Sequence, residues 1–199
     1  MKKMMNYTLI AMIAAVVSGC GPKAFVKGDY DDNVQDANLL NDKWSESDMQ
    51  KAVRDLVSSA TSHYAISSSK RPPVVMVSRL QNKTSEHIDT QSVTDMMRVE
   101  LMRGGKVQFV DKAAREDMAE EVEYQKDNAS RTTRKEGGQQ IGADFILNGR
   151  IDSIVQQAGR DKSVYYKMTM NMTNLKTGII VWSDYKQIRK RFKKQRVGL

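Results

Sequence analysis

The chain has few of the residues that most often cross-link a fold or carry chemistry. Its 199 residues include one cysteine, two histidines and three prolines. A lone cysteine, Cys20, cannot form a disulfide bond within the chain, so the fold depends on its hydrophobic core. A zinc site needs three or four converging ligands, whereas His63 follows a predicted helix and His87 lies in a predicted loop. We therefore expect no metal site and no bound cofactor.

Sequence motifs for catalysis and nucleotide binding are also missing. The glycines at 137, 138 and 142 come without the lysine of a P-loop and without G-x-G-x-x-G spacing. No G-x-S-x-G nucleophile motif occurs. The acidic residues of 112–125 fit the solvated face of a helix better than a pair of catalytic carboxylates. We expect no enzymatic activity and no catalytic residues.

The one long apolar run lies at the N-terminus. Residues 9–17 are apolar and follow a short basic segment at residues 2–3. A run of about nine residues fits the core of a signal peptide and is too short to span a bilayer. Residues 1–19 are therefore predicted to be a signal peptide.

The end of the signal peptide predicts a lipid anchor. Val17-Ser18-Gly19-Cys20 resembles the bacterial lipobox, in which small residues precede a cysteine that receives the lipid. An ordinary secretory signal with a cysteine by chance at its small-residue site is the alternative. Gly21 stands where aspartate retains lipoproteins in the inner membrane of Gram-negative bacteria. We expect an outer-membrane protein, anchored through the lipid on Cys20 and facing the periplasm.

The mature chain is predicted to have three parts. Residues 20–43 are mostly polar and form a lipidated N-terminus and flexible linker, which could reach about 80 Å when fully extended. Residues 44–187 form a globular domain, and residues 188–199 form a basic C-terminal tail. From Lys186 onward there are seven basic and no acidic residues. The tail is either solvated or attracts an anionic envelope polymer. Because the remaining chain is nearly neutral, nucleic acid is not an expected partner.

Hydrophobic periodicity predicts an α+β fold. Helical spacing occurs over 44–60, 90–103 and 111–125, and short apolar strands over 74–77 and 106–110. Ser45, with Asp48 three residues later, predicts a capping box for the first helix, and Thr90 can cap the second. The third helix is predicted to have a narrow apolar stripe of Ala114, Met118 and Val122. Three consecutive strands follow, at 145–154, 164–173 and 179–183. Helical crossovers favour parallel neighbours early in the chain, and short turns favour an antiparallel meander later. The expected architecture is an α/β sandwich, with about three helices packed on a single mixed β-sheet.

The strand 164–173 predicts a surface as well as a core. Its even-numbered residues are apolar, and the methionines among them fit a core better than a metal site. The odd-numbered residues share the opposite face with polar residues of the preceding strand. Tyrosine and arginine are common anchors of protein interfaces. We predict partner binding by Tyr165, Arg150, Asp152 and Lys167. The alternative is a polar face that meets water or lies under the first helix.

Six segments, in order, resemble the LpoB-type lipoproteins, which are outer-membrane activators of bifunctional penicillin-binding proteins. They are residues 44–48, 71–77, 82–90, 105–110, 141–149 and 177–183. The resemblance implies a domain similar to the N-terminal domain of TolB, with no catalysis of its own. It also implies binding to the accessory domain of a class A penicillin-binding protein and stimulation of peptidoglycan synthesis. An alternative function is assembly of a curli-type secretion apparatus in the outer membrane, because lipoproteins of that class share a related fold.

Overall fold

The computed structural model describes residues 40–111, 114–135, 137–138 and 140–194. The predicted signal peptide, Cys20 and nearly all of the predicted linker lie outside the described residues, as do residues 195–199. Among the described residues, no helix combines the length and the apolar character needed to cross a bilayer.

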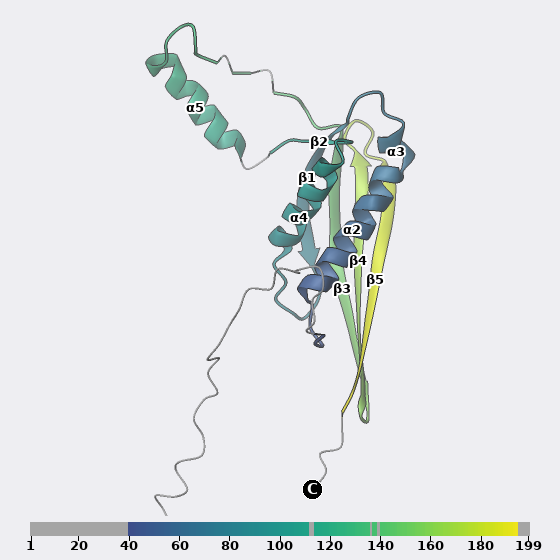
Figure 1. The fold of residues 1–199 in the computed structure, drawn as a ribbon. Coiled ribbons are helices and arrows are strands. Elements are labelled where there is room, and N and C mark those ends of the chain that lie inside the picture. The colour runs from purple at the N-terminus through teal and green to yellow at the C-terminus, as the bar shows by residue number, and fades with distance from the viewer. Residues whose placement is uncertain (1–39, 112–113, 136, 139, 195–199) are drawn as a thin grey trace, which may run out of the picture. The chain divides into compact units, whose positions relative to one another are not determined.

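Five strands form one mixed sheet in the order β2-β1-β3-β4-β5 (Figure 1). The second strand in this order, β1 (Val74–Asn82), pairs in parallel with β2 (Gln108–Phe109) and with β3 (Phe145–Ala158). The strands β4 (Asp161–Asn174) and β5 (Ile180–Lys193) add an antiparallel meander. A two-residue turn joins β3 to β4, and its Gly159 adopts the positive φ that such turns require. The predicted mixed sheet is confirmed.

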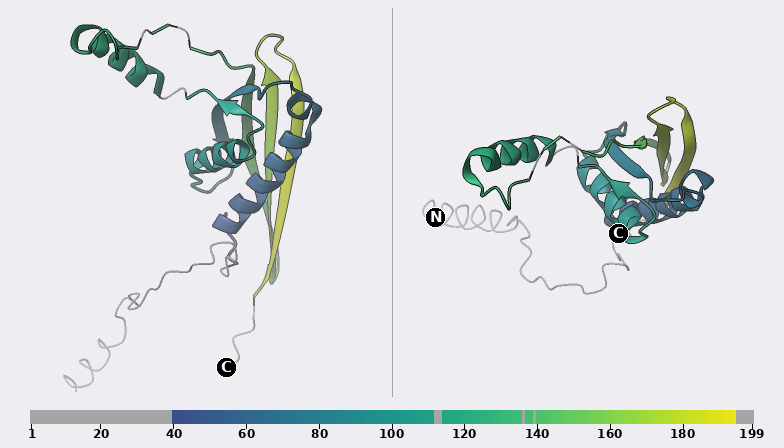
Figure 2. Two further views of the ribbon diagram at one scale, coloured as in Figure 1. Left: turned by 45° about the horizontal axis from the view of Figure 1, so that its top comes forward. Right: turned by 90° about the horizontal axis from the view of Figure 1, so that it is seen from above.

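Two helices, α2 (Glu46–Ser62) and α4 (Thr90–Arg103), pack on the same face of the sheet (Figure 2). The short helix α3 (Tyr64–Ser67) follows α2 and contributes Ile66 to the core. Both α2 and α4 bury residues at helical spacing against the inward side chains of the strands. This core includes Ala52, Val53 and Leu56 of α2, Val93, Met97 and Leu101 of α4, and Met168, Met170 and Met172 of β4. The α+β fold and the packing of the methionines in the core are confirmed.

The helix starts follow local capping chemistry. As predicted, α2 begins after Ser45, whose backbone N–H and hydroxyl both donate to the Asp48 carboxylate, each at 2.9 Å. Thr90 was expected to cap α4, but Asp89 is the N-cap. Its carboxylate accepts hydrogen bonds from the backbone N–H groups of Gln91 and Ser92, at 3.0 and 3.2 Å. A carboxylate can satisfy two free N–H groups together, and its charge suits the helix N-terminus.

The prediction that residues 188–199 form a tail outside the domain is wrong for residues 188–193. The closing strand was expected over 179–183, but β5 continues to Lys193, which pairs with Asp161 at the start of β4. Because β4 offers backbone hydrogen-bonding groups along its whole length, pairing stabilises even this highly charged segment. The predicted boundary at residue 188 falls inside β5.

The helix predicted over 111–125 is present as α5 (Ala114–Asn128), and the Asp111 carboxylate accepts the N–H of Ala114 at 3.2 Å. Its predicted apolar stripe is not buried. No described side chain of α5 is buried, and Met118 in the stripe is 47% exposed. Three apolar positions among many charges make a stripe narrower than helices normally bury.

Candidate functional site

The four residues predicted to bind a partner lie together on the face of the sheet opposite the core. We call this surface the open face: the even-numbered residues 150–156 of β3 and the odd-numbered residues 163–171 of β4 and 183–191 of β5. Asp152 pairs across the strands with Lys167, Arg150 lies one row away opposite Thr169, and Tyr165 is opposite Ile154. The register thus brings Arg150, Asp152, Tyr165 and Lys167 onto one surface.

Arg150 and Asp152 form an ion pair on the open face. The Arg150 Nε lies 3.0 Å from Asp152 Oδ2. Both side chains retain contact with solvent, and an ion pair of this kind contributes at most about 1 kcal/mol. A carboxylate of another protein could therefore replace Asp152 as the partner of the guanidinium at small cost. Arginine suits this exchange because its planar fork can bind a carboxylate with two hydrogen bonds.

Two further residues of the open face come from the part of β5 that sequence reasoning assigned to the tail or left unassigned. The guanidinium carbon of Arg189 lies 5.7 Å from the centre of the Tyr165 ring, within the range of a cation–π contact. Tyr185 is exposed and lies opposite Thr169. The sequence signal is weak: Trp182, Ile188 and Phe192 recur at even-numbered positions, but Asp184, Lys186 and Lys190 interrupt the alternation. The open face therefore presents two tyrosines among arginines and a lysine.

A polar hollow of about 570 Å³ adjoins Arg150. It forms where β1 shifts its register against β3 between Val77 and Leu80. Its lining includes Ser78, Arg79, Gln81, Asn148, Arg150 and Asn171. These side chains offer amide, hydroxyl and guanidinium groups, which suit a carboxylate or amide of a bound protein. The open face thus has a recess for a polar side chain beside Arg150 and Thr169, the residue opposite Tyr185.

On the reverse side of the same strands, a group of contacts holds the start of α2 against β4 and β5. We call it the anchor cluster: Trp44, Asp48, Glu86, Tyr166 and Lys190. Tyr166 is buried, donates its hydroxyl hydrogen to Glu86, and meets the Trp44 ring edge-on at 5.4 Å. Burial raises the pKa of the Tyr166 hydroxyl, and the hydrogen bond to Glu86 raises it further. Tyr166 therefore remains a protonated donor at neutral pH.

Lys190 is the central cation of the anchor cluster. It forms an ion pair with Asp48, and the two side chains are only 3% and 8% exposed. Its Nζ also donates to the carbonyl oxygen of Lys43 at 2.6 Å. Since Asp48 belongs to the capping box of α2, Lys190 ties the far half of β5 to the start of the domain. These contacts hold β4 and β5 in a defined position from the side opposite the open face.

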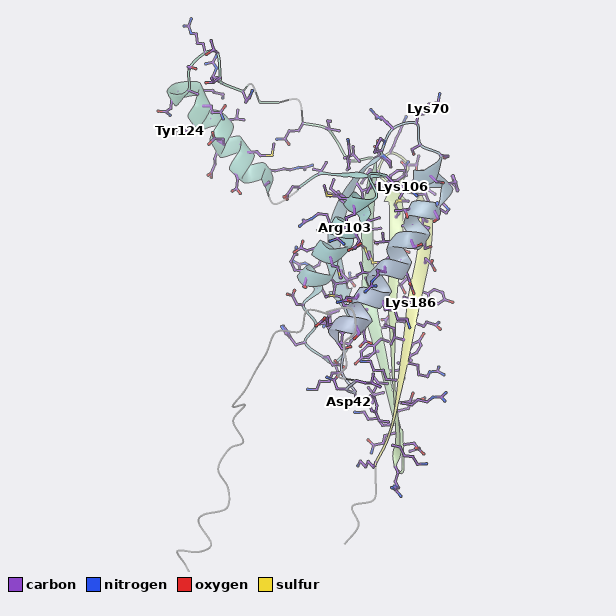
Figure 3. All side chains as sticks on the ribbon, in the orientation of Figure 1. Asp42, Lys70, Arg103, Lys106, Tyr124 and Lys186 are labelled. Atoms are coloured by element: carbon purple, nitrogen blue, oxygen red, sulfur yellow. The ribbon has the colours of Figure 1, made fainter. Side chains whose placement is uncertain are left out.

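Two other ion pairs, which are partly exposed, also connect the start of the domain to β4 and β5. Asp42, labelled in Figure 3, pairs with Lys162 of β4, and Lys186 of β5 pairs with Asp55 of α2. The hydrogen bond from Lys162 lowers the pKa of the Asp42 carboxyl below its usual value. Deprotonated Asp42 therefore favours the folded state, and this contribution is lost as the pH falls through the lowered pKa.

His63 serves the fold as a helix cap, whereas His87 is exposed in the loop before α4. The Nδ1 of His63 accepts the backbone N–H of Ala65 at 3.3 Å and so caps α3. Across the described part of the chain, no group of three or more histidine, cysteine, aspartate and glutamate side chains could hold a metal ion.

Comparison with known proteins gives one family and several solved structures. The family model for the peptidoglycan-synthase activator LpoB matches residues 46–188. The C-terminal domain of LpoB from Salmonella enterica is 18% identical, with 71% of this chain and 98% of that chain covered and a TM-score of 0.43. The corresponding domain from Escherichia coli is 16% identical over the same shares, with a TM-score of 0.44. Lipoprotein GNA1162 from Neisseria meningitidis is 15% identical, with coverages of 63% and 88% and a TM-score of 0.41. No curated protein sequence matches this chain.

Proposed function

Because this chain belongs to the LpoB family of peptidoglycan-synthase activators, we propose that it binds a bifunctional, class A penicillin-binding protein and stimulates peptidoglycan synthesis. The family match carries this proposal, since it extends from the first residue of α2 into β5. Such an activator works by binding an enzyme and needs no catalytic residues of its own. The proposed contact on the synthase is its small accessory domain.

We propose the open face as the surface that binds this accessory domain. Tyr165 offers a rigid ring, and Arg150 and Lys167 offer charge for carboxylates of the partner. The anchor cluster supports the proposal, because it fixes the same strands from behind and limits the entropy lost on binding. The polar hollow beside Arg150 would receive a polar side chain of the partner.

Changing the open face should weaken binding without unfolding the domain. Tyr165→Ala removes an aromatic anchor, and Arg150→Glu reverses the charge beside the hollow. Each should cost about 1–2 kcal/mol or more of binding free energy, or roughly 5- to 30-fold in Kd. Folding stability should change by less than about 0.5 kcal/mol, because these are surface positions. A titration of the synthase's accessory domain against each variant measures the first effect, and thermal melts measure the second.

A matched control is Tyr64→Ala, which removes an exposed tyrosine from α3, away from the open face. It should bind the accessory domain as tightly as the unmodified chain. Full-strength binding by both the Tyr165 and the Arg150 variants would instead place the interface at residues 78–90 or 126–138.

We propose that the mature chain is anchored in the outer membrane by lipid on Cys20, with its folded domain in the periplasm. Cys20→Ala removes the thiol that the lipid is attached to, so the precursor should remain uncleaved and incorporate no labelled fatty acid. Labelling in cells followed by membrane fractionation measures both. Ser18→Ala keeps a small residue before the cysteine and should be labelled normally. Label on the Cys20→Ala chain would contradict the anchor.

We also propose that the basic residues of β5 attract an anionic envelope polymer. The exposed Arg189, Arg191 and Lys193 support this proposal. Truncation after Gln187 is unsuitable for testing it, because it would remove Lys190 and half of β5. Replacing the three exposed residues by glutamine tests the charge and leaves the strand in place.

A further inference from the structure

One long segment of the sheet edge has no neighbouring strand among those that the structure describes. Pairing between β1 and β3 ends where Asn82 meets Ile151. Pairing between β3 and β4 continues without a register shift to Ala158 and Asp161. Residues 153–157 of β3 therefore have a described strand on one side only. We call this segment the β3 edge.

The backbone of the β3 edge faces outward at every second residue. The carbonyl oxygen of Ile151 accepts the N–H of Lys83 at 2.8 Å, so Ile151 points its backbone groups away from β4. In an antiparallel pair, this direction alternates with each residue. Ser153, Val155 and Gln157 therefore turn their N–H and C=O groups away from β4, whereas Ile154 and Gln156 bond to β4. The edge offers three donor and acceptor pairs to an added strand.

The β3 edge lacks the devices that usually block strand addition. Such devices are charged residues, above all lysine, and prolines, yet the segment reads Ser-Ile-Val-Gln-Gln. Ile154 and Val155 are 56% and 51% exposed, and they point to opposite faces of the sheet. The other long edge, β5, carries Lys186, Arg189 and Arg191 and is protected by charge. Charged side chains thus protect the β5 edge against strand addition, whereas the β3 edge lacks this protection.

We propose that the β3 edge binds an extended segment of a partner protein as an added β-strand. Backbone hydrogen bonds to Ser153, Val155 and Gln157 would supply affinity, as in other cases of strand addition. Cross-strand contacts with Ile154 and Val155 select a segment with a β-branched or aromatic side chain on each face.

Charge near the edge indicates an acidic partner. Residues 152–163 and 188–194 form the end of the sheet that carries the edge, and they contain seven basic and two acidic residues. Lys162 and Lys190 are paired with Asp42 and Asp48, which leaves five basic residues. Two copies of this chain joined edge to edge would bring these positive charges together, which is unfavourable. An extended segment flanked by aspartate or glutamate is attracted instead. The preferred occupant is an acidic segment of another protein rather than a second copy.

Amide hydrogen exchange, measured by NMR on the full chain, tests the proposal directly. The probe is a synthetic peptide of alternating valine and threonine with glutamates at both ends. At saturation, the amides of Ser153, Val155 and Gln157 should exchange at least about tenfold more slowly, because new hydrogen bonds protect them. Ile154 and Gln156 should change little. The same peptide with lysine ends should bind at least about tenfold more weakly at low salt.

Two proline variants separate the edge from general effects on the sheet. Val155→Pro removes a donor that points outward and leaves the bonds between β3 and β4 in place, so the peptide should no longer bind. Gln187→Pro is the matched control, because the same alternation turns Gln187 outward on β5; this variant should bind normally. If Val155→Pro fails to melt cooperatively, Val155→Glu takes its place, since water can solvate the carboxylate at this exposed edge position and its charge should repel the glutamate-flanked peptide.

Three results would overturn the proposal. The first is unchanged exchange at Ser153, Val155 and Gln157 when the glutamate-flanked peptide is in excess. The second is protection that appears without peptide as protein concentration rises, together with dimers in sedimentation, which would assign the edge to a second copy. The third is protection or line broadening centred on Tyr165 and Lys167, which would place the peptide on the open face.

Discussion

Replacing Lys190 by alanine is expected to lower the free energy of unfolding by about 3–5 kcal/mol, because it leaves a buried carboxylate without its counter-charge. Asp48 is 8% exposed at its side chain and pairs with Lys190. The substitution also removes the donor to the carbonyl oxygen of Lys43, which lies before α2. The loss should therefore free the start of the domain from β5. Denaturant unfolding followed by circular dichroism measures the change.

Two controls assign the effect to the buried pair. Lys193→Ala removes an exposed basic residue from the same strand and should change stability by less than about 0.5 kcal/mol. The double variant Asp48→Ala with Lys190→Met should lose less stability than the two single variants added together, because no unpaired charge remains. Equal effects of Lys190→Ala and Lys193→Ala would show that water reaches the pair in solution.

Val164→Asp is expected to unfold the domain, at a cost above about 4 kcal/mol. Val164 has no solvent-exposed surface and belongs to the inward set of β4 side chains. A carboxylate there has to enter the folded state either charged without a partner or protonated, and both are unfavourable. Loss of the cooperative thermal transition and of near-ultraviolet circular dichroism measures the effect.

The neighbouring residue provides the matched control. Tyr165→Asp introduces the same group one position along β4, but on the open face, where water can solvate the carboxylate. It should change stability by less than about 1 kcal/mol and should still weaken binding to the accessory domain. A Val164→Asp variant that melts like the unmodified chain would contradict the assignment of even-numbered β4 residues to the core.

The local pattern of the sequence determined the fold class and much of the candidate surface. Strict alternation along β4 separates Val164 and the methionines from Tyr165 and Lys167, because successive side chains of a strand point to opposite faces. Helical spacing and the capping box placed α2 within two residues. Helical crossovers and short turns gave the mixed sheet, since they restrict how neighbouring strands can pair. These features depend on residues close together in the chain, so the sequence displays them directly.

Only the tertiary structure decided where the strands end and which charges are buried. A run as basic as residues 186–194 looks like a solvated tail, yet β4 offers it a complete backbone partner, and Asp48 and the carbonyl of Lys43 satisfy Lys190. The β3 edge likewise exists because β1 stops at Asn82, while β3 stays paired with β4 as far as the turn at Gly159. Both outcomes depend on the relative lengths of strands far apart in sequence. Their free energies come from pairing and desolvation across those distances, which no local pattern records.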